Sequence, residues 1–192
     1  MLKDCAETTD EEIVQRTLQD QEWYGCLVER YQAPLLRYIR RLSGLSAEDA
    51  EDILQEVFIN AYRNLRDFDP ALKFSSWIYR ITRNATISDH RKRTARVQLI
   101  GGESAEQFLE MVKDERDVHT EVSQRLDAAT VQRLIQRLDR KYADVLLLRY
   151  VEEKDYQEIS DIMQKPVGTI GTLMHRAKAQ LRSIIEKENI EL

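Results

Sequence analysis

The chain has few glycines and prolines and no long apolar run. Six glycines and three prolines among 192 residues are too few for a turn-rich β fold, whereas 33% charged and 42% hydrophobic residues are typical of folded helices. The longest apolar run, at 145–148, is far shorter than the roughly 20 residues that cross a bilayer. Residues 1–20 are acidic and lack the apolar segment of a signal peptide. We therefore predict an all-α protein of the cytoplasm, with no membrane insertion.

Cysteine and histidine are also scarce and scattered. Cys5 and Cys26 are the only cysteines, and in a chain without an export signal we predict reduced thiols without a structural role, with a redox switch as the alternative. His90, His119 and His175 are far apart in the sequence, so no metal site is expected. No glycine-rich phosphate loop and no nucleophile–base spacing is present. The sequence therefore predicts neither an enzyme nor a bound cofactor.

Helical periodicity divides the chain into two parts, as its length of 192 residues favours. The first part, residues 1–96, has four predicted helices, which begin near 9, 23, 46 and 74. The second part, residues 126–192, has four more, at about 126–138, 142–150, 155–163 and 166–186. Residues 97–125 lose the periodicity and are rich in acids. We predict two small helical domains joined by a flexible acidic linker.

Basic residues are concentrated at the end of the first predicted domain. Between residues 80 and 96 only Asp89 is acidic, while the cations are Arg80, Arg83, Arg91, Lys92, Arg93 and Arg96. In a chain with a net charge of −5, this pattern favours contact with phosphates over a solvated helix face. Trp77 falls on the apolar stripe and is predicted to lie in the core. Tyr79 lies off that stripe and is the better candidate for stacking on an unpaired base.

The last two predicted helices have the pattern of a helix-turn-helix. Asp155 and Glu158 form a plausible cap pair for the first of them, and Pro166 can open the second. Val167, Ile170, Met174, Ala177, Leu181 and Ile184 form the expected buried stripe of the second helix. Residues 163–182 contain four lysines and arginines and no acid, as in a recognition helix. A generic α-hairpin would show the same apolar spacing.

Three stretches together resemble one family. The segments DAEDILQEVFINAYRNL at 49–65 and FSSWIYRITRN at 74–84 resemble the first domain of bacterial extracytoplasmic-function (ECF) sigma factors. The segment from VGTI to HRA at 167–177 is similar to the carboxy-terminal helix-turn-helix of that family. The match runs in order from residue 23 to residue 185. This resemblance implies a subunit that directs core RNA polymerase to promoters.

The resemblance also implies three groups of binding residues and their partners. Those expected on the β′ clamp helices of the polymerase are Asp49, Asp52, Gln55, Glu56 and Asn60. Those expected on the minus-ten promoter element are Tyr79, Arg80, Arg83, Asn84, Arg91, Lys92 and Arg93. Those expected on the minus-thirty-five element are Thr169, Thr172, His175, Arg176 and Lys178. The β flap of the polymerase and an anti-sigma protein, often membrane-anchored in this family, are further expected partners.

The chain also departs from the family pattern. Gly171 and Leu173 stand where the family commonly has basic residues, which leaves the promoter sequence open. A stand-alone helix-turn-helix regulator would explain the second domain but not the segments at 49–65 and 74–84. A helical adaptor that binds no nucleic acid is a further alternative.

Overall fold

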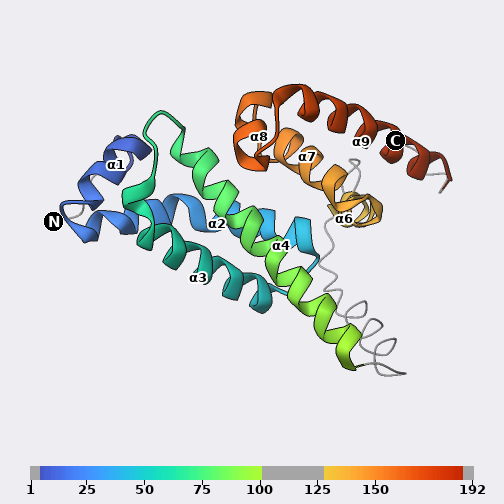
Figure 1. Cartoon of the computed structure of the whole chain (residues 1–192), viewed down its shortest axis with the longest axis horizontal. Helices are drawn as coiled ribbons and strands as arrows, with labels where there is room; N and C mark the ends of the chain where they lie inside the picture. Colours follow the sequence, from blue (N-terminus) through green and yellow to red (C-terminus); the bar gives the residue numbers. More distant parts are fainter. Residues whose placement is uncertain (1–4, 101–127, 188–192) are drawn as a thin grey trace.

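The computed structural model describes residues 5–100 and 128–187, and every regular element in these two ranges is a helix (Figure 1). This confirms the predicted all-α class. The helix that begins at Phe74 continues to Ile100, so its last four residues fall within the predicted linker, 97–125. The rest of the predicted linker, residues 101–125, lies outside the described residues.

An N-terminal helical cluster consists of α1 (Asp10–Thr17), α2 (Tyr24–Ser43), α3 (Ala47–Arg63) and α4 (Phe74–Ile100). Two short 3-10 helices, η1 (Gln21–Trp23) and η2 (Leu65–Asp67), join them. The capping box predicted for α1 is present: the N–H of Glu12 donates to the Thr9 hydroxyl, and the N–H of Thr9 donates to the Glu12 carboxylate. Gly44 ends α2 with a positive φ of 71°, which glycine adopts without steric cost.

Aromatic side chains fill the core of this cluster. Phe74 and Trp77 on α4 pack edge to face against Phe68, and Phe74 also meets Tyr31 of α2. Trp77 is only 6% exposed, which confirms its predicted place in the core. The four helices thus share one apolar interior, and α3 and α4 lie side by side over it (Figure 1).

A C-terminal helical cluster consists of α6 (Ala128–Arg137), α7 (Arg140–Tyr150), α8 (Tyr156–Met163) and α9 (Val167–Lys187). The predicted Asp155–Glu158 capping box opens α8, and Gln164 closes it in the left-handed conformation. On α9, Ile170, Met174 and Ala177 are buried as expected, and Leu181 and Ile184 pack partly against the core. Val167 is 39% exposed, contrary to expectation, because a side chain in the first turn projects beyond the helix end.

The two clusters pack against each other. Helix α8 lies on α4, and helices α6 and α7 lie on α2. In Figure 1 the C-terminal cluster covers the side of α4 that faces away from α3. The buried apolar side chains of the two clusters form one continuous group.

Cys5 and Cys26 form a disulfide, so the prediction of reduced, structurally incidental thiols is wrong for this structure. Arg30 explains why the two cysteines meet. Its guanidinium donates to the carbonyl oxygens of Cys5 and Thr8 at 2.6 and 2.9 Å and pairs with Asp10. These bonds fold the segment before α1 back along α2, with Cα atoms of the cysteines 5.5 Å apart.

Replacement of Cys5 tests the contribution of this disulfide to stability. Because the bond closes a loop with a sequence separation of 21 residues, Cys5→Ser is expected to lower the free energy of unfolding by about 2–3 kcal/mol without reductant. Thermal and urea unfolding measure the change. With dithiothreitol, the wild type and Cys5→Ser should unfold at the same temperature. Two freely titrating thiols in the untreated native chain would contradict the disulfide.

Candidate nucleic-acid interface

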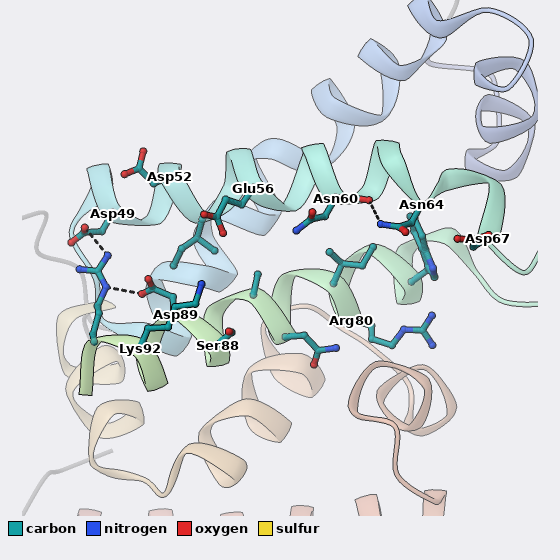
Figure 2. Close-up of a pocket in the computed structure, with 16 residues that line it drawn as sticks. Asp49, Asp52, Glu56, Asn60, Asn64, Asp67, Arg80, Ser88, Asp89 and Lys92 are labelled. Atoms are coloured by element: carbon teal, nitrogen blue, oxygen red, sulfur yellow. Dashed lines mark hydrogen bonds and ion pairs between the residues drawn. The ribbon is translucent and has the colours of Figure 1, made fainter. Parts of the chain in front are cut away.

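An open groove of about 780 Å³ runs between α3 and α4. Figure 2 shows acids and amides of α3 along one wall and mainly basic and polar groups of α4 along the other. The labelled groups of the first wall are Asp49, Asp52, Glu56, Asn60, Asn64 and Asp67, the last of which belongs to η2. Those of the second wall are Arg80, Ser88, Asp89 and Lys92.

The α3 wall carries most of the residues predicted to bind polymerase. Asp52, Glu56 and Asn60 recur every four residues, so they share one face of the helix, and all three are exposed. Gln55 is also exposed on α3, although it does not line the groove. These four side chains are accessible to a partner.

Asp49 and Arg93 bind each other across the end of the groove. Arg93 donates to Asp49 at 2.8 Å and to Asp89 at 2.7 Å, as the dashed lines in Figure 2 show. The hydrogen bond from Arg93, with a further one from Ser46, lowers the pKa of Asp49 below its ordinary value. Asp49 was predicted to bind polymerase, and Arg93 was predicted to bind DNA. Each prediction therefore requires that the Asp49–Arg93 ion pair breaks before the residue binds its external partner.

The α4 wall presents the accessible part of the predicted minus-ten set. Arg80, Asn84 and Lys92 line the groove, and Asn84 and Arg91 also line a second hollow of about 290 Å³. The side chains of Arg80, Arg91 and Lys92 make no hydrogen bond or ion pair with any residue that the structure describes. Their charges are available to an anion. The side chain of Arg96 lies outside the described residues.

Two members of the same set are covered by the C-terminal cluster. Tyr79 is 3% exposed and its hydroxyl donates to Glu152 at 2.5 Å, so the prediction of an accessible Tyr79 is wrong in this conformation. The Arg83 Nε donates to Asp144 at 2.5 Å, and its side chain is 15% exposed. Sequence reasoning missed both acidic partners. Asp144 had a signal, since it interrupts the apolar run at 143–148 and a carboxylate buried there needs a partner.

Helix α9 exposes all of its predicted minus-thirty-five residues. Their side chains lie outside the buried stripe and are Thr169, Thr172, His175, Arg176 and Lys178. The Lys178 ammonium lies 5.5 Å from the ring centre of Tyr150. Gly171 has open space around its Cβ direction, whereas Leu173 packs partly against the core. A larger side chain than that of glycine therefore fits at residue 171.

Two family models match the chain at the two clusters. Sigma-70 region 2 matches residues 27–96, which contain the whole α3–α4 groove, and Sigma-70 region 4 matches residues 128–181. The ECF RNA polymerase sigma factor SigW of Bacillus subtilis (strain 168) is 35% identical over 172 residues, which cover 85% of this chain and 89% of SigW. The chain belongs to the ECF family of RNA polymerase sigma factors.

Solved sigma-factor structures have the same fold. CnrH in complex with the cytosolic domain of CnrY matches with a TM-score of 0.67 and 21% identity, over 93% of this chain and 97% of CnrH. RpoE in complex with the anti-sigma factor NepR from Bartonella quintana matches with a TM-score of 0.65 and 20% identity, over 88% and 98%. The two helical clusters of this sigma factor are thus those of the family.

The described residues contain neither a candidate membrane span nor a candidate metal-binding cluster. No helix in 5–100 or 128–187 is both long and apolar enough to cross a membrane. No group of three or more His, Cys, Asp or Glu side chains in these ranges is arranged to hold a metal ion.

The Asp49–Arg93 pair predicts a pH-dependent contribution to stability. Because the folded pKa of Asp49 is lowered, the contribution is full above the unfolded pKa of about 3.9 and is lost as the pH falls through the folded pKa. Asp49→Asn should therefore cost about 0.5 kcal/mol at pH 7, the screened value of an exposed pair, and nothing at strongly acidic pH. Urea unfolding at both pH values measures this. Asp52→Asn is the control, and an equal loss in that variant would contradict the assignment.

Proposed function

We propose that this sigma factor binds core RNA polymerase through the exposed face of α3, and that α4 and α9 then contact promoter DNA. The observation that carries the proposal is the α3–α4 groove, where exposed acids and amides stand opposite the side chains of Arg80 and Lys92, which are unpaired within the described ranges. The subunit acts by binding and not by covalent catalysis. Its place of action is the cytoplasm, with the polymerase.

The α3 face suits a basic partner surface. Asp52 and Glu56 are exposed carboxylates one turn apart, with the amides of Gln55 and Asn60 beside them. Charge complementarity of this kind orients a complex and raises its association rate. We assign this face to the β′ clamp helices, with Asp49 joining when Arg93 releases it.

The α4 wall suits a single strand. The Asn84 amide can donate and accept along a base edge, which a hydrocarbon cannot. Arg80, Arg91 and Lys92 supply positive charge for the adjacent phosphates. Binding energy for the unstacked strand then offsets the few kcal/mol that unstacking costs. In this scheme residues 1–96 form the domain that binds the minus-ten element.

The C-terminal cluster suits duplex DNA. Thr169, Thr172, His175, Arg176 and Lys178 lie on the exposed side of α9, where a recognition helix meets the major groove. We assign residues 126–192 to a domain that reads the minus-thirty-five element and docks on the β flap. The acidic linker between the domains stays a prediction.

An anti-sigma protein is the proposed regulator. CnrH was solved in complex with the cytosolic domain of CnrY, and the Bartonella RpoE was solved in complex with the anti-sigma factor NepR. We propose such a partner for this chain, of the membrane-anchored kind common in the family. A stand-alone regulator would leave the α3–α4 groove without a function.

Run-off transcription with purified core enzyme on a genomic promoter library tests the function. The sigma factor should produce discrete transcripts with core and bind duplex promoters poorly without it. Tight duplex binding by the chain alone, with no transcripts in the presence of core, would favour the stand-alone regulator instead.

Charge reversal on α3 tests the polymerase face. Glu56→Arg places a cation where a basic partner is expected and should weaken core binding by about tenfold or more, since like charges at an interface cost several kcal/mol. Competition binding with labelled core measures it. Glu51→Arg changes the same charge at an exposed position of α3 outside the groove and should bind nearly as the wild type does. Equal losses in the two variants would contradict the assigned face.

Gly171→Lys tests the reading face of α9. The side chain has room, and one added phosphate contact should steepen the slope of log affinity against log salt by about 0.9. Fluorescence anisotropy with promoter duplex at several salt concentrations measures the slope. Gly171→Ala is the control. Removal of the glycine stabilises the helix by roughly 1 kcal/mol, and alanine adds no positive charge. An unchanged slope in Gly171→Lys would place residue 171 away from DNA.

A further inference from the structure

The Cys5–Cys26 disulfide closes a loop that contains the whole of α1. The two cysteines are 21 residues apart, and both α1 and η1 lie between them. A crosslink of this kind restricts the opened conformations of a loop more than the packed one, so it disfavours any opening of α1. The bond therefore controls how often α1 leaves the core.

Helix α1 in turn supports the start of α4. Its Glu11 carboxylate accepts the N–H of Phe74 at 3.2 Å, one of the first-turn N–H groups that a helix cannot satisfy by itself. A carboxylate at this end also interacts favourably with the helix dipole. Ile13 and Val14 of α1 are fully buried and belong to the same core as Phe74. Opening of α1 would therefore loosen the first turn of α4, less than two turns before Arg80 in the proposed minus-ten wall.

The fold around the cysteines does not depend on the disulfide alone. Arg30 donates to the carbonyl oxygens of Cys5 and Thr8. It also pairs with Asp10. None of these contacts involves a sulfur atom, so a reduced chain retains them. They hold the Cα atoms of the two cysteines 5.5 Å apart, within the range of about 4.4–6.8 Å that a disulfide requires. The bond can therefore open and form again while the chain stays folded.

The proposed place of action gives this bond a role beyond stability. Disulfides that occur in the cytosol are usually transient and serve catalysis or redox sensing, because cellular thiols keep reducing them. We propose that Cys5 and Cys26 are a thiol–disulfide switch, in which a peroxide closes the bond and a dithiol reductant opens it. The closed form holds α1 and the start of α4 in place, and the open form loosens both. This inference rests on the proposed function of α4 in the cytoplasm.

Hydrogen peroxide oxidises the pair in two steps. Cys5 is partly exposed and Cys26 is buried, so the peroxide reaches the Cys5 sulfur first. This sulfur attacks one peroxide oxygen, the O–O bond breaks, and the leaving hydroxide takes up the thiol proton, which gives a sulfenic acid and one water. The Cys26 sulfur then forms the S–S bond and displaces the second water. In the reverse direction a dithiol supplies two electrons and two protons, becomes a disulfide itself and restores both thiols.

Hydrogen exchange tests the link between the bond and α4. The wild type is compared with and without dithiothreitol, by mass spectrometry of peptides from α1, from the start of α4 and from α9. Exchange in α1 should be about thirtyfold slower in the oxidised chain, as expected from closing a loop of this length, and the first turn of α4 should slow with it. Peptides of α9 should not change, and Cys5→Ser should not respond to dithiothreitol. A start of α4 that exchanges equally in both forms would overturn the link.

Transcription with each form of the sigma factor tests the switch itself. The protein is treated with hydrogen peroxide or with dithiothreitol, and the reagent is removed before core polymerase is added. Alkylation and mass spectrometry count the free thiols. At limiting sigma factor, the oxidised wild type should give about threefold more run-off transcript than the reduced form, because a larger fraction is competent. Cys5→Ser, the control for other oxidation, should give equal amounts after either treatment.

Two results would overturn the switch. One is equal transcription by the oxidised and reduced wild type, which would leave the bond a purely structural crosslink. The other is a pair of thiols that stays free after peroxide treatment. Failure of the proposed function is distinct, because neither form would then yield transcripts, while the exchange rates of α1 would still differ between the two forms.

Discussion

The Asp144 carboxylate is the interaction on which the arrangement of this sigma factor depends. It is buried where α7 meets α2 and α4, with its two oxygens bound by Tyr38 and Arg83. Burial, and then the neighbouring Asp144 charge, raise the pKa of Tyr38 well above its ordinary value, so its hydroxyl remains a donor. Without these donors the carboxylate would be a buried, uncompensated charge, and the two clusters would have to separate or rearrange.

The proposed contact with nucleic acid depends on where the charges of this acidic chain lie, and not on its net charge. Acids occupy α3 and the contact surface of the C-terminal cluster, while cations extend along α4 and α9. Where the two signs meet, they pair: Asp49 with Arg93, Asp144 with Arg83. Each pair ties a residue assigned to DNA to an acid of the same chain. An external partner must therefore replace an internal bond before it gains the cation.

Local features of the fold were predictable from the sequence. The capping boxes at Thr9 and Asp155 depend on residues three apart, and the buried stripe of α9 depends on helical spacing. The exposed face of α3 followed from the same periodicity. Contacts between residues far apart in the sequence were not predictable. Tyr79 lies 73 residues from Glu152, and no periodicity encodes that meeting.

The pairing of the two cysteines was also not predictable from the sequence. An export signal says only which surroundings the chain meets, whereas the pairing of Cys5 with Cys26 follows from how Arg30 folds the segment before α1. The Asp144 partners, 61 and 106 residues away, are also tertiary. An acid inside an apolar run indicates that a partner exists, but only the packed structure identifies it.

A double-mutant cycle between Tyr38 and Asp144 tests the central contact most directly. Urea unfolding of the wild type, Tyr38→Phe, Asp144→Ala and the double variant gives the coupling energy between the two side chains. The account predicts a coupling of about 1–3 kcal/mol, because each single change leaves a buried partner with an unmade hydrogen bond. Additive effects, within roughly 0.3 kcal/mol, would show that the two side chains do not meet and would contradict the account.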